Sequence, residues 1–561
     1  MKRYVNILVL ITIILAAVIP YLNSIHNPFI WDEEVMIAGN PIIKDWKYLP
    51  DVFKTSIFGG PIGSSGFYRP VYALSFMLDY SIWQLNTIGY HLFNIFLHVL
   101  NGILLYFLIV KLCLRRNIAW LASLLFVLFP INCHVVALVA GRIELILGFL
   151  SLLYILSFLN GIERSKAYFL ASVFLFISSL FTKESALMLP FIMLAYVFVF
   201  LEKEKRRKTM LPLAVLMAIL FAYPVLRYFL LGSPLRGTLS LINEASFLER
   251  VYTLPRILLT YIQLIVAPIS LKSEYNFVVH AFRDPYVWMG VPGLAAIFFL
   301  ILKFLKPTKH AIFFSCWFLI GLAPYSNLGV PLHATLIEHW GYFSSMGFAV
   351  LMSMAIFKIV EKISRRQKYV FAAIIVSLAI FYAAKIVERN KEWGDPFVLY
   401  KRDSEKEPAS FLLHCNLGVE YFRRGMLEDA KKEFILSNKV CPGAGYDIAY
   451  NNLGVIYARE GRIQEAVSYY RQSIVLNNYA LAYANLGGLY NNLKMHKDAI
   501  TVLGDGAARY PLNIEILYQL GVAYYEDGQP GPAKQAFQRV ENIQKDYSKT
   551  KMFLDMITDK H

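Results

Sequence analysis

Three consecutive carboxylates, Asp32, Glu33 and Glu34, stand directly after the first apolar run of this chain, in the stretch NPFIWDEEVMI. Ionisable side chains at a membrane edge are costly to desolvate, so their presence there points to a function. A carboxylate in such a place can accept a proton from a reacting group. The residues around the triplet have to show whether it is used in this way.

Further polar residues gather at the outer turns of the apolar runs that follow. His91, Asn94 and His98 are spaced i, i+3 and i+7, so they share one helical face. The full set beyond the triplet comprises Tyr68, Arg69, His91, Asn94, His98, His134, Arg142, Glu144, Lys183, Glu184, Glu338 and His339. Their placement on one side predicts a pocket that receives a charged lipid headgroup from the membrane and a second substrate from outside.

Each of these residues also has a structural interpretation. Asp32 can cap an interfacial helix, and Lys183 with Glu184 can form an ion pair at a turn. The face that contains His91 can be a hydrogen-bonding surface between helices, and Arg69 can anchor a lipid headgroup. No single residue decides between the interpretations, but their joint placement favours a site.

The composition places these residues in a membrane protein. Of the 561 residues, 57% are apolar and only 17% are charged, which is too apolar for a soluble chain of this length. The formal net charge is +16, but the segment after residue 400 holds 20 Lys+Arg and 19 Asp+Glu, so nearly all the excess lies in the apolar part. This distribution suits the positive-inside bias of membrane loops, and no nucleic-acid partner is expected.

The five cysteines show no metal-ligand spacing, so no metal site is predicted, although the acidic groups could bind a divalent cation. Cys113, Cys133 and Cys316 lie in apolar runs and are expected to be inert. Cys415 and Cys441 flank one helical repeat, where a disulfide is an alternative.

Eleven apolar runs are predicted to cross the membrane. The first follows Lys2 and Arg3 and lacks a small-residue cleavage site, so we expect a retained helix with a cytoplasmic N-terminus. The large loop at about 24–90 then lies outside, along the membrane surface. The predicted spans are this first run and 92–111, 118–133, 144–160, 167–181, 186–201, 210–231, 287–304, 309–328, 342–359 and 368–387.

The stretch 254–271 is expected to be re-entrant or interfacial, because Pro255 and Pro268 would break its backbone. With this assignment the basic clusters of the loops are all cytoplasmic, and the C-terminus lies on the extracytoplasmic side. We therefore predict an all-α chain with a membrane domain at 1–390, a linker at 391–407 and an extracytoplasmic domain at 408–555.

A repeat of about 34 residues dominates this last domain. A Leu-Gly pair, with a Tyr three residues after the Gly, recurs at Leu417, Leu453, Leu486 and Leu520, and an Ala follows twelve residues after each Gly. Small residues at these places let the two helices of a unit approach closely. The pattern predicts a tetratricopeptide-repeat α-solenoid of about four repeats, whose concave groove commonly binds peptides.

The ordered motifs resemble those of a known family. WDE at 31–33 is followed by YRP at 68–70, GYHLFNIFLH at 89–98, AGRIE at 140–144, TKES at 182–185 and EHWGYFSSMG at 338–347. With the repeats, this order resembles the transmembrane and tetratricopeptide-repeat-containing O-mannosyltransferases, especially their prokaryotic relatives. That family belongs to the GT-C superfamily of glycosyltransferases that use polyprenyl-phosphate sugars. The resemblance covers nearly the whole chain and implies a GT-C-type membrane domain, but it does not fix the sugar.

The resemblance also implies roles for residues. Asp32 matches the acidic catalytic position of the family, with Glu33 beside it, and which of the two is the base is left open. Arg69 and Arg142 match basic positions near the lipid phosphate, and Lys183 matches the Lys of a Lys–Glu pair. His339 stands where many eukaryotic members have an Arg. The residues expected to line the substrate pocket are Tyr68, His91, His98, His134, Glu144, Glu184, Glu338 and His339.

These residues suit an inverting glycosyltransferase that moves a sugar from polyprenyl phosphate to a hydroxyl acceptor, such as a protein Ser or Thr, outside the cytoplasm. The lipid phosphate is a competent leaving group, so one carboxylate takes the acceptor proton while cations stabilise the phosphate. Because Asp32 and Glu33 are adjacent, they are not expected to flank one sugar as the separated pair of a glycosidase does. The lipid-linked sugar is a co-substrate, and no cofactor is expected.

The repeats would hold the acceptor or a partner enzyme, and the whole chain would be a multi-pass protein of a prokaryotic inner membrane. Two other classes are alternatives. A membrane-anchored repeat scaffold for envelope assembly explains the solenoid but not the polar outer turns. A lipid-linked sugar transporter requires charged residues near mid-membrane, whereas here they cluster at one edge.

Overall fold

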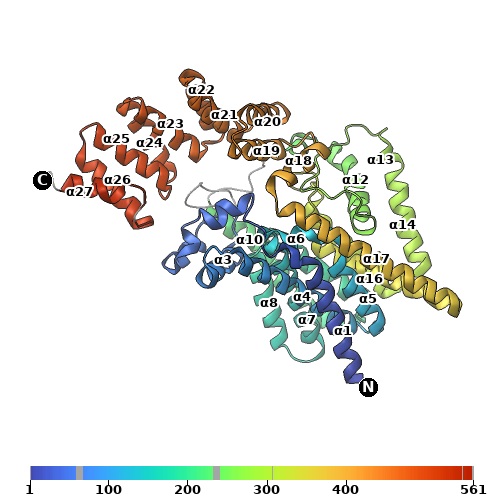
Figure 1. Cartoon of the computed structure of the whole chain (residues 1–561). Coiled ribbons are helices and arrows are strands. Elements are labelled where there is room, and N and C mark those ends of the chain that lie inside the picture. Colours follow the sequence, from blue (N-terminus) through green and yellow to red (C-terminus); the bar gives the residue numbers. More distant parts are fainter. Residues whose placement is uncertain (1, 58–66, 232–239, 306–307, 546, 559–561) are drawn as a thin grey trace. The chain divides into compact units, whose positions relative to one another are not determined.

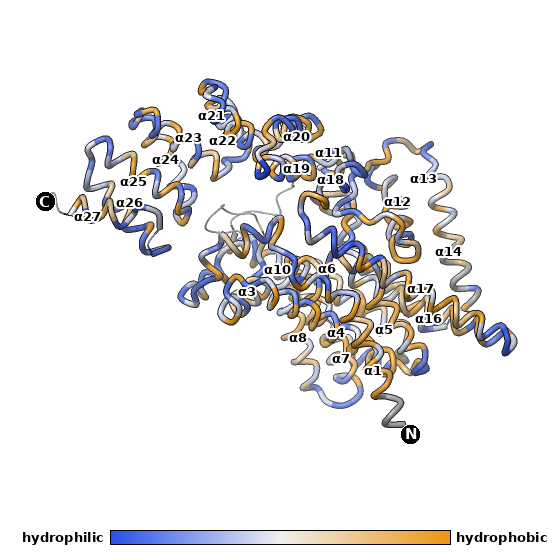
Figure 2. Tube along the Cα trace, in the orientation of Figure 1, coloured by the Kyte–Doolittle hydropathy of each residue, from blue (hydrophilic) through white to orange (hydrophobic). Residues whose placement is uncertain are grey.

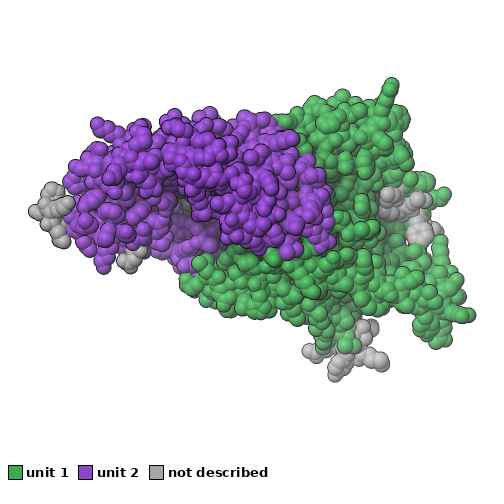
Figure 3. All heavy atoms as spheres, turned by 45° about the horizontal axis from the view of Figure 1, so that its top comes forward, with its two compact units in different colours: residues 1–30, 82–396 green, residues 31–81, 397–561 purple. Residues whose placement is uncertain are grey.

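The computed structural model describes residues 2–57, 67–231, 240–305, 308–545 and 547–558 (Figure 1). Within these ranges every regular element is a helix, and extended pairing is limited to one antiparallel bridge between Tyr275 and Leu336. The all-α prediction is therefore confirmed. The chain divides into two units, each made of two separate stretches (Figure 3). The helical-bundle unit comprises residues 1–30 and 82–396, and the loop–repeat unit comprises residues 31–81 and 397–561.

Six helices of the helical-bundle unit are long and apolar enough to cross a membrane, counted over the described ranges. They are α1 (Lys2–Val18) continued by η1 (Ile19–Ser24), α4 (Thr87–Lys111), α7 (Arg142–Glu163) preceded by η6 (Val139–Gly141), α10 (Lys203–Leu231), α16 (Tyr342–Lys362) preceded by η9 (Glu338–Gly341), and α17 (Arg365–Trp393). A seventh results if α5 (Arg116–Leu128) and the segment Pro130–Ala137, bent by 51°, form one span. Apolar residues dominate α1, α4, α5 and α7 in Figure 2.

This count differs from the eleven spans predicted from apolar runs. Four of the predicted spans form shorter helices, α8 (Ala167–Leu180), α9 (Leu189–Phe200), α14 (Gly290–Leu305) and α15 (Lys309–Leu322), which have 14, 12, 16 and 14 residues. A straight helix needs about 20 residues to cross the hydrocarbon core. The polar residues TKES at 182–185 and the 3₁₀ turn η7 (Glu184–Met188) separate α8 from α9, so these two apolar runs do not join into one longer helix.

The stretch predicted to be re-entrant lies mostly in a continuous helix, α12 (Phe247–Val266). Pro255 is inside this helix and does not break it, contrary to the prediction. A capping box of Ser246 and Glu249 fixes the start of the helix. The helix is not among the candidate spans of the described residues, and its place relative to a membrane stays a prediction. It is followed by α13 (Pro285–Trp288) and α14 (Gly290–Leu305).

Short 3₁₀ turns interrupt the bundle helices and carry several predicted site residues. Besides η6 and η9 they are η5 (Pro130–Asn132), η7 (Glu184–Met188) and η8 (Ala323–Tyr325). The turn η5 packs on η9, η7 packs on η8, and the short helix α6 (Cys133–Ala137) packs on both η6 and η9. A Cβ at Gly141 would overlap the carbonyl oxygen of Val135, so this close approach requires glycine. The helix breaks therefore bring polar side chains from distant parts of the sequence together.

The loop–repeat unit starts with an uncommon backbone conformation. Trp31 has a left-handed φ of 58°, and the π-helical turn η2 (Glu34–Ala38) begins three residues later. Such conformations concentrate at functional sites, because the surrounding fold has to stabilise them. The loop continues through η3 (Ile42–Lys44), η4 (Trp46–Tyr48), α2 (Leu49–Val52) and α3 (Pro70–Trp83).

The repeats are helix pairs, as the sequence predicts. After α18 (Pro396–Lys406) the pairs are α19 (Phe411–Arg423) with α20 (Leu427–Val440), α21 (Asp447–Arg459) with α22 (Ile463–Asn477), α23 (Ala480–Asn492) with α24 (His496–Arg509), and α25 (Ile514–Glu526) with α26 (Pro530–Ile543), followed by α27 (Thr550–Thr558). A Cβ at Gly454 would lie 2.7 Å from the ring of Tyr470, which explains the glycine of the repeat signature. Cys415 and Cys441 are both buried free thiols, so the alternative disulfide is not present.

Candidate functional site

The three carboxylates of the acidic triplet occupy three different environments. Asp32 is exposed, Glu33 is 1% exposed, and Glu34 is partly buried. Glu34 accepts a hydrogen bond from the guanidinium of Arg423, with 2.6 Å between Oε2 and Nη2. Within the described ranges, no hydrogen bond or ion pair engages the carboxylate of Asp32. Asp32 is therefore accessible to a substrate, whereas the other two carboxylates are buried or bound.

The pKa of Asp32 lies above its ordinary value of 3.8, because the surrounding protein desolvates the charged form although the side chain is exposed. The guanidinium of Arg69 lowers this pKa and offsets part of the rise. A carboxylate with a raised pKa holds a transferred proton better than an ordinary aspartate does. Perturbed carboxylates of this kind are common at catalytic sites.

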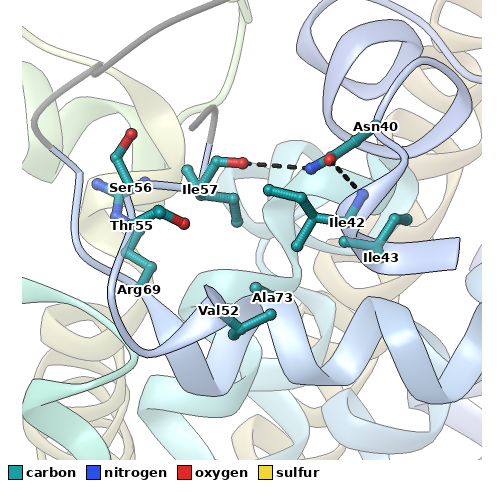
Figure 4. Close-up of a pocket in the computed structure, with 9 residues that line it drawn as sticks. All are labelled: Asn40, Ile42, Ile43, Val52, Thr55, Ser56, Ile57, Arg69 and Ala73. Carbon is teal, nitrogen blue, oxygen red and sulfur yellow. Dashed lines mark hydrogen bonds between the residues drawn. The ribbon is translucent and has the colours of Figure 1, made fainter. Parts of the chain in front are cut away.

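Arg69 lies beside a small cavity of the same unit (Figure 4). Its guanidinium carbon is 4.3 Å from the ring centre of Phe67, and the hydroxyl of the neighbouring Tyr68 donates to the carbonyl of Phe53 at 3.0 Å. The cavity between Asn40, Thr55 and Arg69 offers about 10 Å³ to the centre of a water molecule, which is room for about one water. It does not accommodate a phosphate in this form, so phosphate binding by Arg69 stays a prediction.

In the helical-bundle unit, Lys183 and Glu144 form a buried ion pair. The ammonium group of Lys183 donates to the carboxylate of Glu144, and their side chains are 9% and 1% exposed. Tyr325 contacts both, because its ring centre is 4.9 Å from the ammonium and its hydroxyl donates to Glu144 at 3.5 Å. Glu184 faces the guanidinium of Arg227 at 3.7 Å. Lys183 and Glu144, and likewise Arg227 and Glu184, therefore form pairs of opposite charge.

Aromatic rings connect this ion pair to His134 and His339, which lie in α6 and η9. Tyr325 stacks on Trp340, with ring centres 5.2 Å apart, and His339 packs edge-on against Trp340. The Nδ1 atom of His339 is 3.3 Å from Nε2 of His134, and the His134 ring is 4.8 Å from that of Trp393. The helix breaks therefore place Glu144, Lys183, His134 and His339 in one connected network.

Glu338 has a separate set of partners. It is fully buried and accepts hydrogen bonds from the backbone N–H of Lys272 at 2.6 Å and from the hydroxyl of Tyr275 at 2.8 Å. Tyr275 also forms the antiparallel bridge with Leu336. Glu338 therefore holds the segment after α12 against the turn η9.

Arg142 is fully buried where α4 and α7 pack together. Its Nε donates to Oδ1 of Asn94 and its Nη2 to the carbonyl of Tyr90, both at 2.9 Å. The guanidinium also lies over the ring of Phe93, 4.8 Å from its centre. These contacts connect two helices, and binding of a lipid phosphate by Arg142 stays a prediction.

The two histidines of α4 form hydrogen bonds between elements. Nε2 of His91 is 3.1 Å from the carbonyl oxygen of Asn27, and Nδ1 of His98 is 2.9 Å from the hydroxyl of Tyr342. Both histidines are buried. This geometry agrees with the structural interpretation of the His91 face, and a role in the substrate pocket stays a prediction.

Three residues with notable contacts were not selected from the sequence. Arg227 lies within the apolar run 210–231 and Tyr325 follows a proline at the end of another run, so their polarity at membrane depth was an available signal. Arg423 carries no such signal, because exposed cations are common on repeat helices. In the described part of the chain, no group of three or more His, Cys, Asp or Glu could hold a metal ion.

The apolar helices and the helix pairs define a multi-pass membrane protein with tetratricopeptide repeats. Tetratricopeptide-repeat family profiles match residues 448–480 and 515–543. The chain is 27% identical over 450 residues to Protein O-mannosyl-transferase F38B6.6 of Caenorhabditis elegans, covering 78% of this chain and 63% of that protein. It is 25% identical over 566 residues to Protein O-mannosyl-transferase TMTC3 of Mus musculus, covering 85% of this chain and 61% of that protein. The chain is thus a distant homologue of the TMTC-type protein O-mannosyltransferases over most of its length.

The chain spans about three fifths of the length of these curated relatives. Among solved structures, the tetratricopeptide protein YrrB is 19% identical, with a TM-score of 0.24, and the match covers 36% of this chain and 98% of that one.

Proposed function

We propose that this protein is a membrane glycosyltransferase that moves a sugar from a polyprenyl-phosphate carrier to a hydroxyl group of a protein acceptor. The observation that carries the proposal is the homology to protein O-mannosyl-transferases, which extends across the membrane helices and the repeats. The names of these relatives make mannose the first sugar to test.

Asp32 is the proposed base. The acceptor oxygen attacks the anomeric carbon of the sugar on the face opposite the phosphate, and the acceptor proton passes to the Asp32 carboxylate. The bond between the anomeric carbon and the phosphate oxygen breaks, and its electron pair leaves with the polyprenyl phosphate, so the configuration inverts. The exposure and raised pKa of Asp32 support its choice over the buried Glu33. A positioned base contributes a factor of roughly 10² to 10⁴.

Arg69 is the proposed cation for the departing phosphate. It belongs to the same unit as Asp32, and its charge already acts on the Asp32 carboxyl. Arg142 and Lys183 can join it only if phosphate oxygens replace the acceptors that they bind now, which are Asn94 and Glu144. One lost contact to the developing charge costs on the order of 3–4 kcal/mol of transition-state stabilisation.

The proposed topology keeps the N-terminus in the cytoplasm of a prokaryotic cell and places the acidic triplet and the repeats outside. It retains eleven crossings, because basic residues then collect on the cytoplasmic side. Seven are the longer spans, with the bent pair counted as one, and α8, α9, α14 and α15 supply the other four. The repeats bind the acceptor protein, which is the common use of their concave surface.

The test uses membranes that contain the full chain, a tritiated polyprenyl-phosphate mannose and an envelope-protein extract as acceptor. We expect transfer by the wild type, and a loss of roughly 10² to 10⁴ for Asp32→Asn. Asp45→Asn is the matched control, because Asp45 is an exposed acid of the same loop that caps η4. Undiminished transfer by the double variant Asp32→Asn, Glu33→Gln would refute the proposed catalytic role.

A further inference from the structure

The last turn of α19, in the first repeat, is bound to the acidic triplet by an ionic network. Nη2 of Arg423 donates to Oε2 of Glu34 at 2.6 Å, and Nη1 donates to Oε1 of Glu420 at 2.9 Å. Nη1 of Arg424 donates to the other oxygen of Glu420 at 2.6 Å. The Glu420 side chain is only 8% exposed, so it is a fixed anchor for both guanidinium groups.

We propose that Arg423 is a positioning residue that sets the orientation of Asp32 from the repeat domain, so that the repeats control the rate of sugar transfer. This inference rests on the proposed function, in which Asp32 is the base. Only an arginine can make both contacts in this geometry, because its planar fork places two donors toward two carboxylates. A lysine at 423 would keep one contact.

The position of Glu34 explains how the contact reaches Asp32. Glu34 is the first residue of the π-helical turn η2, and its carbonyl accepts a hydrogen bond from the N–H of Gly39 at 2.8 Å. Trp31, which directly precedes Asp32, has a left-handed φ of 58°. Its ring packs edge-on against that of Tyr400 in α18, with ring centres 6.1 Å apart. Contacts with α18 and with the first repeat therefore hold the backbone on both sides of Asp32.

The second repeat packs against the first. Burial raises the pKa of Tyr446, which stands directly before α21, and the charge of Asp32 adds a smaller contribution. The ring of Tyr446 is 4.9 Å from that of Phe411 at the start of α19. An acceptor that disturbs these first two repeats would therefore act on the same region that orients Asp32.

The ionic contact suits a positioning role better than a stabilising one. The side chains of Arg423 and Glu34 are 47% and 42% exposed, and exposed pairs contribute little to folding stability. The next repeat offers a matched control in Arg462, which pairs with Glu465 at 2.6 Å at exposures of 49% and 45%. Loss of either pair should leave the fold intact.

The experiment is a double-mutant cycle on the full chain, with kcat and KM measured for the polyprenyl-phosphate sugar and for the acceptor. We expect Arg423→Ala and Glu34→Ala each to lower kcat on the order of 10- to 100-fold, since small misplacements of a reacting group have effects of this size. The double variant should be no slower than either single variant. The KM for the donor and the unfolding temperature should stay unchanged, and Arg462→Ala should behave as wild type.

Wild-type kcat in both single variants, or losses that multiply in the double variant, would overturn the inference. Asp32→Asn, assayed in parallel, separates this failure from failure of the proposed function. If Asp32→Asn is inactive while Arg423→Ala is fully active, only the positioning role is lost. If Asp32→Asn transfers sugar normally, the proposed base is wrong and the positioning role falls with it.

Discussion

In the helical-bundle unit the carboxylate of Glu144 is buried against the ammonium group of Lys183, whereas in the loop–repeat unit the carboxylate of Asp32 is exposed and has a raised pKa. A buried carboxylate that is paired with a cation is stabilised as the anion and therefore accepts a proton less readily. Removal of either member of the pair leaves the other charge buried without a partner. A charge that is accessible and partly desolvated remains able to react. The paired charges of the bundle therefore favour a structural role there, and the exposed Asp32 supports the proposal that the loop carries the base.

The largest effect on stability is expected for Lys183→Met. This substitution leaves Glu144 buried without its cation, which should cost about 3–5 kcal/mol in the free energy of unfolding. The measurement is denaturant unfolding of the full chain in detergent micelles. The double variant Lys183→Met, Glu144→Leu should recover most of the loss, because it removes both charges. A single variant as stable as wild type would contradict the assigned role of this pair.

A smaller loss of stability is expected for Arg142→Gln. Shortening this side chain leaves Oδ1 of Asn94 and the carbonyl of Tyr90 without these donors inside the bundle. A buried polar group without a partner costs about 1–3 kcal/mol. Unfolding in the same detergent series tests this, with the exposed Arg115→Gln as control. Normal stability combined with weakened donor binding would instead support the predicted phosphate-binding role.

The third prediction concerns the pH dependence of transfer. Asp32 acts as a base only when it is deprotonated, so activity should fall as the pH drops through its pKa, which lies above 3.8. Arg69 lowers this pKa, so Arg69→Gln should move the acidic limb of kcat/KM to higher pH by a fraction of a unit. An acidic limb that does not move, or that moves to lower pH, would show that Arg69 does not act on the base.

The smallest effect is expected for the stability of Asp32→Asn. Because the folded protein raises the pKa of this carboxyl, ionisation at neutral pH disfavours the folded state slightly. Neutral asparagine removes this penalty, so unfolding at pH 7 should shift toward higher stability by less than about 0.5 kcal/mol. The difference from wild type should disappear at a pH below the ordinary aspartate value. A large destabilisation would place Asp32 among the structural charges instead.

The repeats were the most predictable part of the fold. The Leu-Gly pairs and the Ala twelve residues after each Gly report local packing between two helices of one pair, as the overlap of a Cβ at Gly454 with Tyr470 illustrates. The number of long helices was not predictable from apolar runs, because the bend of 51° after Leu128 lies inside an apolar stretch. The break between α8 and α9, in contrast, coincides with the polar residues TKES at 182–185, where the sequence also separates two predicted spans. Pro255 shows the opposite case, since its helix continues through a residue that usually ends one.

For the candidate site, the sequence identified polar residues but not their partners. The pairing of Lys183 with Glu144 and of Glu184 with Arg227 depends on which 3₁₀ turns meet, which is a property of the tertiary fold. The sequence also left Asp32 and Glu33 equivalent, and only burial distinguishes them. The contact between Glu34 and Arg423 joins residues too far apart in sequence for any local pattern to reveal.

The shared unit of residues 31–81 and 397–561 has a consequence for how the protein is made. A ribosome completes the acidic loop first and then has to synthesise residues 82–396, which takes roughly 15 to 60 s at ordinary elongation rates. During that interval the loop lacks the helices that orient it, and a truncated product never acquires them. The acidic loop therefore completes its contacts with Tyr400 and Arg423 only after the carboxyl-terminal part of the chain has been made.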